Sequence, residues 1–164
     1  MIRSILLSGL VVVMAFVAAC APAEPEASRS AANFTEADFE CLREAIYHEA
    51  GATSVEGGKA VANVILNRAK DPRFPDTVCD VVADGEEQGR CQFSYRCDGL
   101  PERFADEVKL ANAETALSFV AENPEEDVTN GALFFHATWM PPGWFASLKR
   151  TVTLGGNIFY AKPQ

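Results

Sequence analysis

Hydrophobic residues recur at helical spacing in three long segments of the chain and then in short runs near its end. The first segment begins at Thr35, whose hydroxyl can cap a helix while Asp38 reaches back toward it. An apolar stripe then follows at helical spacing and consists of Phe39, Leu42 and Ile46. Glu49 continues the same stripe, so the pattern places a carboxyl group where a helix normally presents an apolar side chain.

A second helix is predicted after Ser54, with Glu56 in its first turn and the pair Asp71-Pro72 as its stop. One face of this helix carries Val61, Val64, Ile65 and Arg68. A short helix is predicted over residues 77–83, followed by a loop over residues 84–99 that contains three glycines.

The third long segment covers residues 101–121, with a proline in its first turn and Asn123-Pro124 after its end. We expect its inward face to consist of Phe104, Val108, Ala111 and either Leu117 or Val120.

The end of the chain is typical of strands. Residues 132–136 are short and aromatic, and residues 151–154 and 158–160 flank Gly155-Gly156-Asn157 as in a hairpin. Helices first and strands last predict an α+β domain with a small C-terminal antiparallel sheet. Residues 137–150 form a long connection that carries Trp139 and Trp144.

The N-terminus reads as a lipoprotein signal peptide over residues 1–20: Arg3 precedes an apolar run, and Val17-Ala18-Ala19-Cys20 resembles a lipobox with Cys20 as the lipidated residue. A plain secretory peptide and a membrane-spanning anchor are the alternatives, but the apolar run is short for a hydrocarbon core of about 30 Å. Residues 21–33 are predicted to be a flexible tether and residues 34–164 one domain. We expect an exported, lipid-anchored protein, on the periplasmic side of the outer membrane if the cell has one.

A formal net charge of −9 argues against binding to nucleic acid or to anionic lipid surfaces. Four cysteines remain after Cys20, namely Cys41, Cys79, Cys91 and Cys97. An even number in an oxidising compartment predicts two disulfides, and all three connectivities stay open. A zinc site competes with this interpretation, but no Cys-x-x-Cys pair exists, and we expect neither a metal nor a cofactor.

Burial raises the pKa of a carboxyl group toward the range in which it can donate a proton at neutral pH, which makes Glu49 a candidate general acid. The alternative is that Glu49 forms an ion pair with Arg43 or Arg68 at the rim of the core. His48 points about 100° away from Glu49 around the helix, which favours a surface or capping role. His136 either positions substrate or makes a structural hydrogen bond.

Sugar-binding clefts combine aromatic faces with amides and hydroxyls. The segment between Cys91 and Cys97 offers an amide, a hydroxyl and two rings, and Trp139 also lies near this predicted wall. Core packing is the alternative role for each aromatic residue. The predicted substrate-binding residues are Gln92, Phe93, Ser94, Tyr95, His136, Trp144 and Tyr160.

Several motifs follow one another over residues 41–160: Ala45-Ile46-Tyr47-His48-Glu49-Ala50, Glu56-Gly57, Ala60 to Arg68, Phe74 to Cys79, Cys91-Gln92-Phe93-Ser94, Cys97-Asp98-Gly99, Gly131 to His136 and Ile158-Phe159-Tyr160. Together they resemble the SleB-like cell-wall hydrolases, which include spore-cortex-lytic enzymes. The resemblance implies a lysozyme-like domain that cuts the glycan strands of peptidoglycan as a lytic transglycosylase, with Glu49 as the catalytic acid. One carboxyl group suffices for this reaction, and Glu56 is the nearest candidate for a second.

Two departures from the family pattern bear on activity. Gly51-Ala52-Thr53 stands where the family usually has Arg-Gly-Glu, and Asn157 stands where a histidine is common. They motivate one alternative, a peptidoglycan-binding lipoprotein without turnover that acts as a tether or on a partner enzyme. A second alternative is a peptidase or amidase that uses Cys41 and His136 as nucleophile and base.

Overall fold

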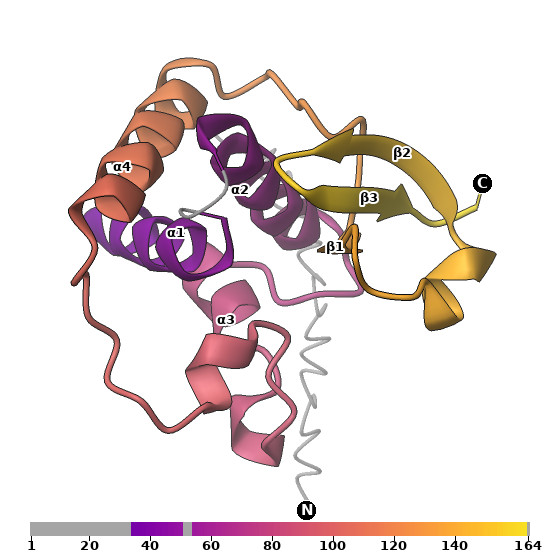
Figure 1. The fold of residues 1–164 in the computed structure, drawn as a ribbon, viewed down its shortest axis with the longest axis horizontal. Helices are drawn as coiled ribbons and strands as arrows, with labels where there is room; N and C mark the ends of the chain where they lie inside the picture. The colour runs from indigo at the N-terminus through magenta and orange to yellow at the C-terminus, as the bar shows by residue number, and fades with distance from the viewer. Residues whose placement is uncertain (1–33, 51–53, 164) are drawn as a thin grey trace, which may run out of the picture.

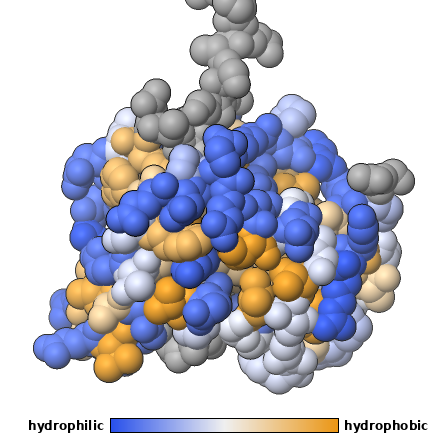
Figure 2. Space-filling view, turned by 90° about the horizontal axis from the view of Figure 1, so that it is seen from above, coloured by the Kyte–Doolittle hydropathy of each residue, from blue (hydrophilic) through white to orange (hydrophobic). Residues whose placement is uncertain are grey.

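The computed structural model describes residues 34–50 and 54–163. Within them the chain forms a group of helices followed by a three-stranded antiparallel sheet (Figure 1), which confirms the predicted α+β class. The predicted signal peptide, Cys20, the tether and the Gly51-Ala52-Thr53 segment lie outside the described residues. No helix in the described part of the chain is both long and apolar enough to cross a membrane. Hydrophilic residues cover most of the face in Figure 2, with apolar patches between them.

Helix α1 spans Glu36–Glu49 and begins as predicted. The Thr35 hydroxyl accepts from the Asp38 amide at 3.2 Å, and the Asp38 carboxylate accepts from the Thr35 amide at 2.9 Å. This reciprocal capping box satisfies two backbone donors that the first turn of a helix leaves open. Leu42 and Ile46 are fully buried, whereas Glu49 at the end of the helix is partly buried.

Helix α2, Val55–Lys70, is the central element of the domain. Its Ser54 cap accepts from the Gly57 amide at 3.1 Å, and the helix ends at Asp71, as predicted. One face packs against α1 and α4, and another packs against the sheet, so the helix is buried on most sides (Figure 1). Gly58 makes this packing feasible, since a Cβ there would lie 2.7 Å from the Ala116 side chain.

Helix α3, Val78–Val82, lies within the segment predicted to be a short helix. The loop after it contains two 3₁₀ turns, η1 (Glu86–Gln88) and η2 (Ser94–Cys97). Disulfides Cys41–Cys79 and Cys91–Cys97 select one of the three open connectivities. The first joins α1 to α3, and the second closes a short loop around η2.

Helix α4 spans Glu107–Glu122 and starts six residues later than predicted. The carboxylate of Asp106 accepts from the Val108 and Lys109 amides, so the helix takes its cap there and not at the proline. The prediction that Phe104, Val108 and Ala111 face inward is therefore wrong, since all three are exposed. The predicted inward positions Leu117 and Val120 are correct, and the buried residues of the helix are Ala113, Ala116, Leu117 and Val120.

The sheet contains β1 (Phe134–Ala137), β2 (Lys149–Leu154) and β3 (Asn157–Ala161) in the order β1-β3-β2. The predicted hairpin joins β2 and β3 through Gly155 and Gly156, which both have positive φ. A Cβ on Gly155 would lie 2.3 Å from Cα of Gly57, so the turn lies directly against the first turn of α2. The 3₁₀ turn η3, Gly143–Ser147, lies in the connection from β1 to β2.

Candidate active site

Glu49 lies at the C-terminal end of α1 with its side chain partly buried. Burial raises the pKa of this carboxyl group, and the positive charge of Arg68 opposes the shift without cancelling it. A carboxyl group with a raised pKa stays partly protonated closer to neutral pH, as a general acid requires.

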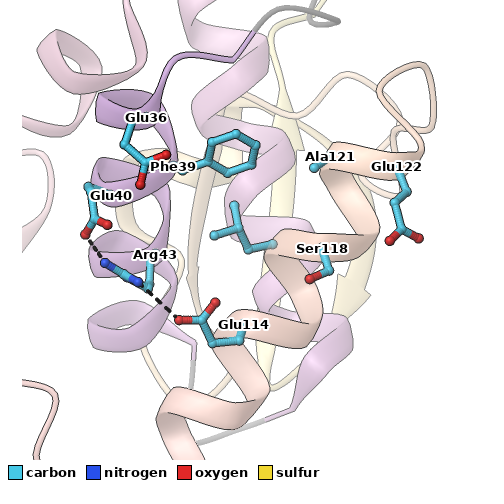
Figure 3. A pocket seen from close by; sticks show the side chains of 9 residues that line it. Glu36, Phe39, Glu40, Arg43, Glu114, Ser118, Ala121 and Glu122 are labelled. Atoms are coloured by element: carbon cyan, nitrogen blue, oxygen red, sulfur yellow. Dashed lines mark hydrogen bonds and ion pairs between the residues drawn. The ribbon is translucent and has the colours of Figure 1, made fainter.

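Glu49 makes no ion pair with either arginine considered from the sequence. Arg43 instead contacts Glu40 and, at 3.4 Å, Glu114 (Figure 3). Within the described residues, no nitrogen of Arg68 lies within 4.0 Å of a Glu49 oxygen, although the two charges interact at longer range. The rim ion pair offered as an alternative role for Glu49 is therefore not formed.

Arg68 projects from α2 into the interior, where only 5% of the residue is exposed. Its Nε donates to the carbonyl oxygen of Leu133 at 2.8 Å. Its guanidinium carbon lies between 5.2 and 5.8 Å from the centres of three aromatic rings, those of Phe74, Phe93 and Phe134. Cation–π attraction compensates part of the cost of burying this charge.

The charge state of Arg68 reflects the same surroundings. Burial lowers the pKa of Arg68 to about 10, although Asp84 and Glu49 oppose this shift. The guanidinium is still protonated at neutral pH, so a fixed positive charge acts on Glu49 from the neighbouring helix. The sequence analysis placed Arg68 on the inward face of α2 but assigned it no functional role. The position of an arginine on an apolar stripe is the sequence feature that could have indicated its burial.

A hydrogen-bonded loop holds Leu133 against α2. Asn67 donates to the Asp127 carboxylate at 3.0 Å and to the Ala132 carbonyl at 3.1 Å. Burial acts to raise the pKa of Asp127, but hydrogen bonds from Thr129 and Asn67 outweigh it, so the pKa is lowered. These hydrogen bonds hold the loop so that the Leu133 carbonyl accepts from Arg68, and β1 begins at the next residue, Phe134.

The cross-linked loop does not display its two rings, contrary to the prediction. Phe93 and Tyr95 are buried, with 1% and 6% exposed, whereas Gln92 and Ser94 are exposed. The amide and the hydroxyl therefore face solvent, while the two rings join the core. Arg96 fixes the loop by donating to Glu44 of α1 at 2.8 Å. Substrate contact by any of these loop residues stays a prediction.

Tyr95 is nevertheless affected by the charge of Glu49. Burial is the main cause that raises the pKa of Tyr95, and the carboxylates of Glu44 and Glu49 add to it. The phenol therefore remains protonated. Its ring stacks on His48, and His48 Nε2 lies 3.1 Å from Glu102. His48 thus packs against the loop as a partly buried side chain, whereas a surface or capping role was predicted for it.

His136 and Tyr160 form a second group, on the sheet. His136 Nδ1 lies 2.8 Å from the Ala137 carbonyl, and Nε2 lies 2.9 Å from the Tyr160 hydroxyl. Since a carbonyl only accepts, Nδ1 donates to it and Nε2 accepts the Tyr160 proton. Both side chains are buried, which favours the structural hydrogen bond over substrate positioning for His136.

Exposed aromatic surface comes from the connection between β1 and β2. Trp144 is 60% exposed and stacks on Phe145 with ring centroids 4.1 Å apart. It also contacts Phe134 edge to face at 5.4 Å, and Phe134 in turn flanks Arg68. Phe134 therefore links the exposed Trp144 to the buried surroundings of Arg68. Trp139 is 82% exposed.

Two other candidate roles are resolved by geometry. Cys41 is bonded to Cys79, so no thiol is present there to act as a nucleophile, and the peptidase alternative is wrong in this form. Glu56 is exposed in the first turn of α2, where a carboxylate favours the helix N-terminus. Among the described residues, no group of three or more His, Cys, Asp and Glu side chains is arranged to hold a metal ion.

A groove of about 350 Å³ lies elsewhere, between α1 and α4 (Figure 3). It has an apolar base and an acidic rim and is lined by Glu36, Phe39, Glu40, Arg43, Glu114, Leu117, Ser118, Ala121 and Glu122. Glu49 does not line it, so the candidate acid lies outside this groove.

Comparison with known sequences identifies one family. The family model described as "Cell Wall Hydrolase" matches residues 52–160, a range that begins just after Glu49. The spore cortex-lytic enzyme of Halalkalibacterium halodurans is 27% identical over 136 residues, covering 82% of this chain and 38% of that enzyme. That of Bacillus subtilis is 43% identical over 49 residues, 30% of this chain and 16% of that enzyme. The chain therefore spans less than half the length of these relatives.

Two solved structures share the fold. The catalytic domain of Bacillus cereus SleB superposes with a TM-score of 0.59 at 24% identity, covering 79% of this chain and 93% of that one. The catalytic domain of the germination-specific lytic transglycosylase SleB from Bacillus anthracis gives a TM-score of 0.60 at 24% identity, covering 79% and 98%. These matches confirm the predicted lysozyme-like α+β architecture.

Proposed function

Because this chain belongs to the cell wall hydrolase family, we propose that it cleaves the glycan strands of peptidoglycan and that Glu49 is its catalytic acid. One observation carries the role of Glu49: its carboxyl group is partly buried, has a raised pKa and is not neutralised by a direct ion pair. Such a group can both release and take up a proton.

The reaction that fits one carboxyl group is a lytic transglycosylation. Protonated Glu49 donates its proton to the bridging oxygen, the C1–O bond breaks, and the electron pair leaves with that oxygen. The C6 hydroxyl oxygen of the same N-acetylmuramic acid then attacks C1, and the Glu49 carboxylate takes the hydroxyl proton. A 1,6-anhydro ring forms, and the acid is regenerated without a second carboxyl group.

Three exposed side chains offer contacts for a glycan. The exposed amide of Gln92 and hydroxyl of Ser94 can hydrogen-bond sugar substituents, and the exposed ring of Trp144 can stack on a pyranose face. Phe93, Tyr95, His136 and Tyr160 are buried and contribute as the supporting layer beneath this surface.

Digestion of purified sacculi tests the proposal. The wild-type protein should release soluble muropeptides with 1,6-anhydro ends, and Glu49→Gln should lose roughly a hundredfold or more of this release. Glu56→Gln is the matched control, because Glu56 is an exposed acid of the same kind, and it should retain full activity.

Mass spectrometry separates the alternatives. Reducing ends heavier by one water would mean hydrolysis by a water nucleophile in place of ring closure. Binding to sacculi without any release, by wild type and Glu49→Gln alike, would mean a binding lipoprotein and would refute the catalytic proposal.

The place of action belongs to the same proposal. We propose that Cys20 is lipidated and anchors the domain through residues 21–33 at a membrane facing the wall. Metabolic labelling with a fatty-acid probe should mark the wild type and not Cys20→Ser.

A further inference from the structure

The C-terminal part of the chain has a charge opposite to that of the whole protein. All 23 aspartate and glutamate residues precede residue 128, whereas Lys149, Arg150 and Lys162 follow it. The formal net charge of −9 therefore does not describe the sheet, whose own charge is positive. All three basic residues are exposed, and within the described part of the chain none of them forms an ion pair.

The register of the sheet places Arg150 beside Trp144. Phe134 of β1 lies opposite Tyr160 of β3, and Tyr160 lies opposite Arg150 of β2. Directly opposed residues point to the same face of a sheet, so these three residues form one row across it. The Trp144 ring contacts that of Phe134 at 5.4 Å, and Phe145, on which Trp144 stacks, lies 5.4 Å from Tyr160. Trp144 and Arg150 therefore share one face at one end of the sheet.

The other two positive charges lie at the same end. Lys149 lies opposite Ala161, the last residue of β3, and Lys162 comes directly after Ala161. The chain enters β2 and leaves β3 at this end (Figure 1). Lys162 acts at longer range on Asp71, whose carboxylate already accepts from Arg73 at 2.6 Å. The positive charges around Trp144 are thus available to an anionic ligand.

Arg150 has the geometry that carboxylate binding requires. Its Nη2 donates to the Thr153 hydroxyl at 2.5 Å, across an irregularity in the pairing of β2. This bond orients the planar guanidinium, and among the described residues its side chain makes no other hydrogen bond. A guanidinium has five N–H donors and binds carboxylates through two of them at once. The donors that Thr153 leaves open can therefore bind a carboxylate.

Protection of a sheet edge does not account for all of these residues. β2 is an edge strand, and exposed basic side chains on an edge disfavour pairing with another chain. Lys162, however, follows β3, which is the central strand. The single sign of every charge after residue 127 fits a ligand of negative charge instead.

We propose that Arg150 and Lys162, with Lys149 beside them, bind the carboxylates of the peptide stems carried by the glycan strand. The binding of stems rests on the proposed function, in which Trp144 stacks on a sugar ring. Each stem begins at the lactyl group on C3 of N-acetylmuramic acid, so a sugar on Trp144 brings a stem within reach of these charges. The lactyl carboxyl is itself in an amide bond, and the free carboxylates are those of the peptides. Stem-bearing strands, and not bare glycan, are then the substrate class.

Sacculi with neutralised stems test the inference. Carbodiimide with excess ethanolamine converts the stem carboxylates to amides and leaves the glycan strands intact. Co-sedimentation measures binding of the full chain carrying Glu49→Gln, which should leave the sacculi uncut. This protein should bind untreated sacculi about fivefold more tightly than amidated sacculi, because each exposed charge pair contributes a modest amount. The difference should shrink as salt is added.

Two pairs of substitutions in the same protein locate the effect. Arg150→Gln with Lys162→Gln should remove the preference by lowering the affinity for untreated sacculi. Arg90→Gln with Arg103→Gln is the matched control, because both arginines are exposed and lie outside the sheet, and it should retain the preference.

Three results would overturn the inference: no preference in the parent protein, a preference that survives Arg150→Gln with Lys162→Gln, or an equal loss of affinity on both preparations. A loss of affinity for phosphatidylglycerol vesicles alone would assign the surface to a membrane and would also overturn it. If the double variant does not fold by circular dichroism, the two single variants replace it, and each should reduce the preference. A wild type that cuts no sacculi defeats the proposed function alone, because the binding preference is measured without turnover.

Discussion

The imidazole ring of His48 lies flat against the phenol ring of Tyr95, with ring centroids 4.5 Å apart and ring planes 12° from parallel. His48 belongs to α1 and Tyr95 to the loop closed by Cys91–Cys97. This stack therefore joins the residue next to Glu49 to a loop more than forty positions later in the chain. The contact packs the C-terminal end of α1, which carries the candidate acid, against this loop.

Removing the His48 ring should loosen this loop. We expect His48→Ala to lower the free energy of unfolding by about 1 kcal/mol, because the stack and the interaction with Glu102 are both lost. His48→Phe keeps a ring and should retain most of the stability. Thermal unfolding of the two variants measures the difference, and equal losses would mean that stacking contributes little.

The two disulfides should contribute unequally to stability. Cys41–Cys79 joins residues 38 positions apart, whereas Cys91–Cys97 spans only 6. Loop-closure entropy predicts losses of about 4 and about 2 kcal/mol when each pair is replaced by alanine. Denaturant unfolding of the two double variants tests the order, and a larger loss for the short loop contradicts it.

Gly155 should tolerate no side chain. Its φ is +51°, and a Cβ would meet the backbone of Gly57 at 2.3 Å, so we expect Gly155→Ala to lose about 3 kcal/mol. Gly131 also has positive φ but has open space around it, and Gly131→Ala should lose only about 1 kcal/mol. Similar melting temperatures for the two variants would mean that the hairpin does not press on α2.

Glu49→Gln should stabilise the protein at neutral pH while removing its activity. Burial raises the pKa of Glu49 in the folded state, so the wild type loses stability as the pH rises through that pKa. Below the unfolded-state pKa both states hold the proton, and the variant loses its advantage. Urea unfolding near pH 7.5 and near pH 3.5 should show a difference only at the higher pH. If Glu49→Gln is less stable than the wild type at pH 7.5, the folded protein stabilises the ionised Glu49 carboxylate, which contradicts this prediction.

The exposed ring of Trp144 should contribute to glycan binding more than that of Trp139. Trp144 is fixed between Phe145 and Phe134, so stacking on a sugar costs little conformational entropy. We expect Trp144→Ala to weaken binding to sacculi by roughly tenfold. Trp139→Ala is the matched control and should have a smaller effect. Equal effects would mean that exposure, and not the fixed geometry, determines binding.

The features that were predicted correctly from the sequence are those that form between residues close together in the chain. The capping box of Thr35, the Ser54 cap and the Gly155-Gly156 turn are local, and each forms where expected. The start of α4 was misplaced because Pro101 and Asp106 are both acceptable beginnings. The Asp106 amide donates to the Tyr47 hydroxyl at 2.9 Å, a tertiary contact that favours the later start.

The candidate site was predictable to a smaller extent for the same reason. Glu49 was identified because one carboxyl group interrupts an apolar stripe, which is a local signal. The burial of Phe93 and Tyr95, and the long-range interaction of Glu49 with Arg68, depend on segments that meet only in the fold.

The disulfide connectivity also has a consequence for the order of folding. Cys41 pairs with the next cysteine in the described chain, Cys79, and Cys91 pairs with Cys97. Oxidation in order of emergence from a ribosome or an export channel therefore gives the native pairs before β1 exists. A free Cys20 would precede them all and compete for Cys41. Lipidation of Cys20, as proposed, would thus remove the thiol that could pair with Cys41 before Cys79 emerges.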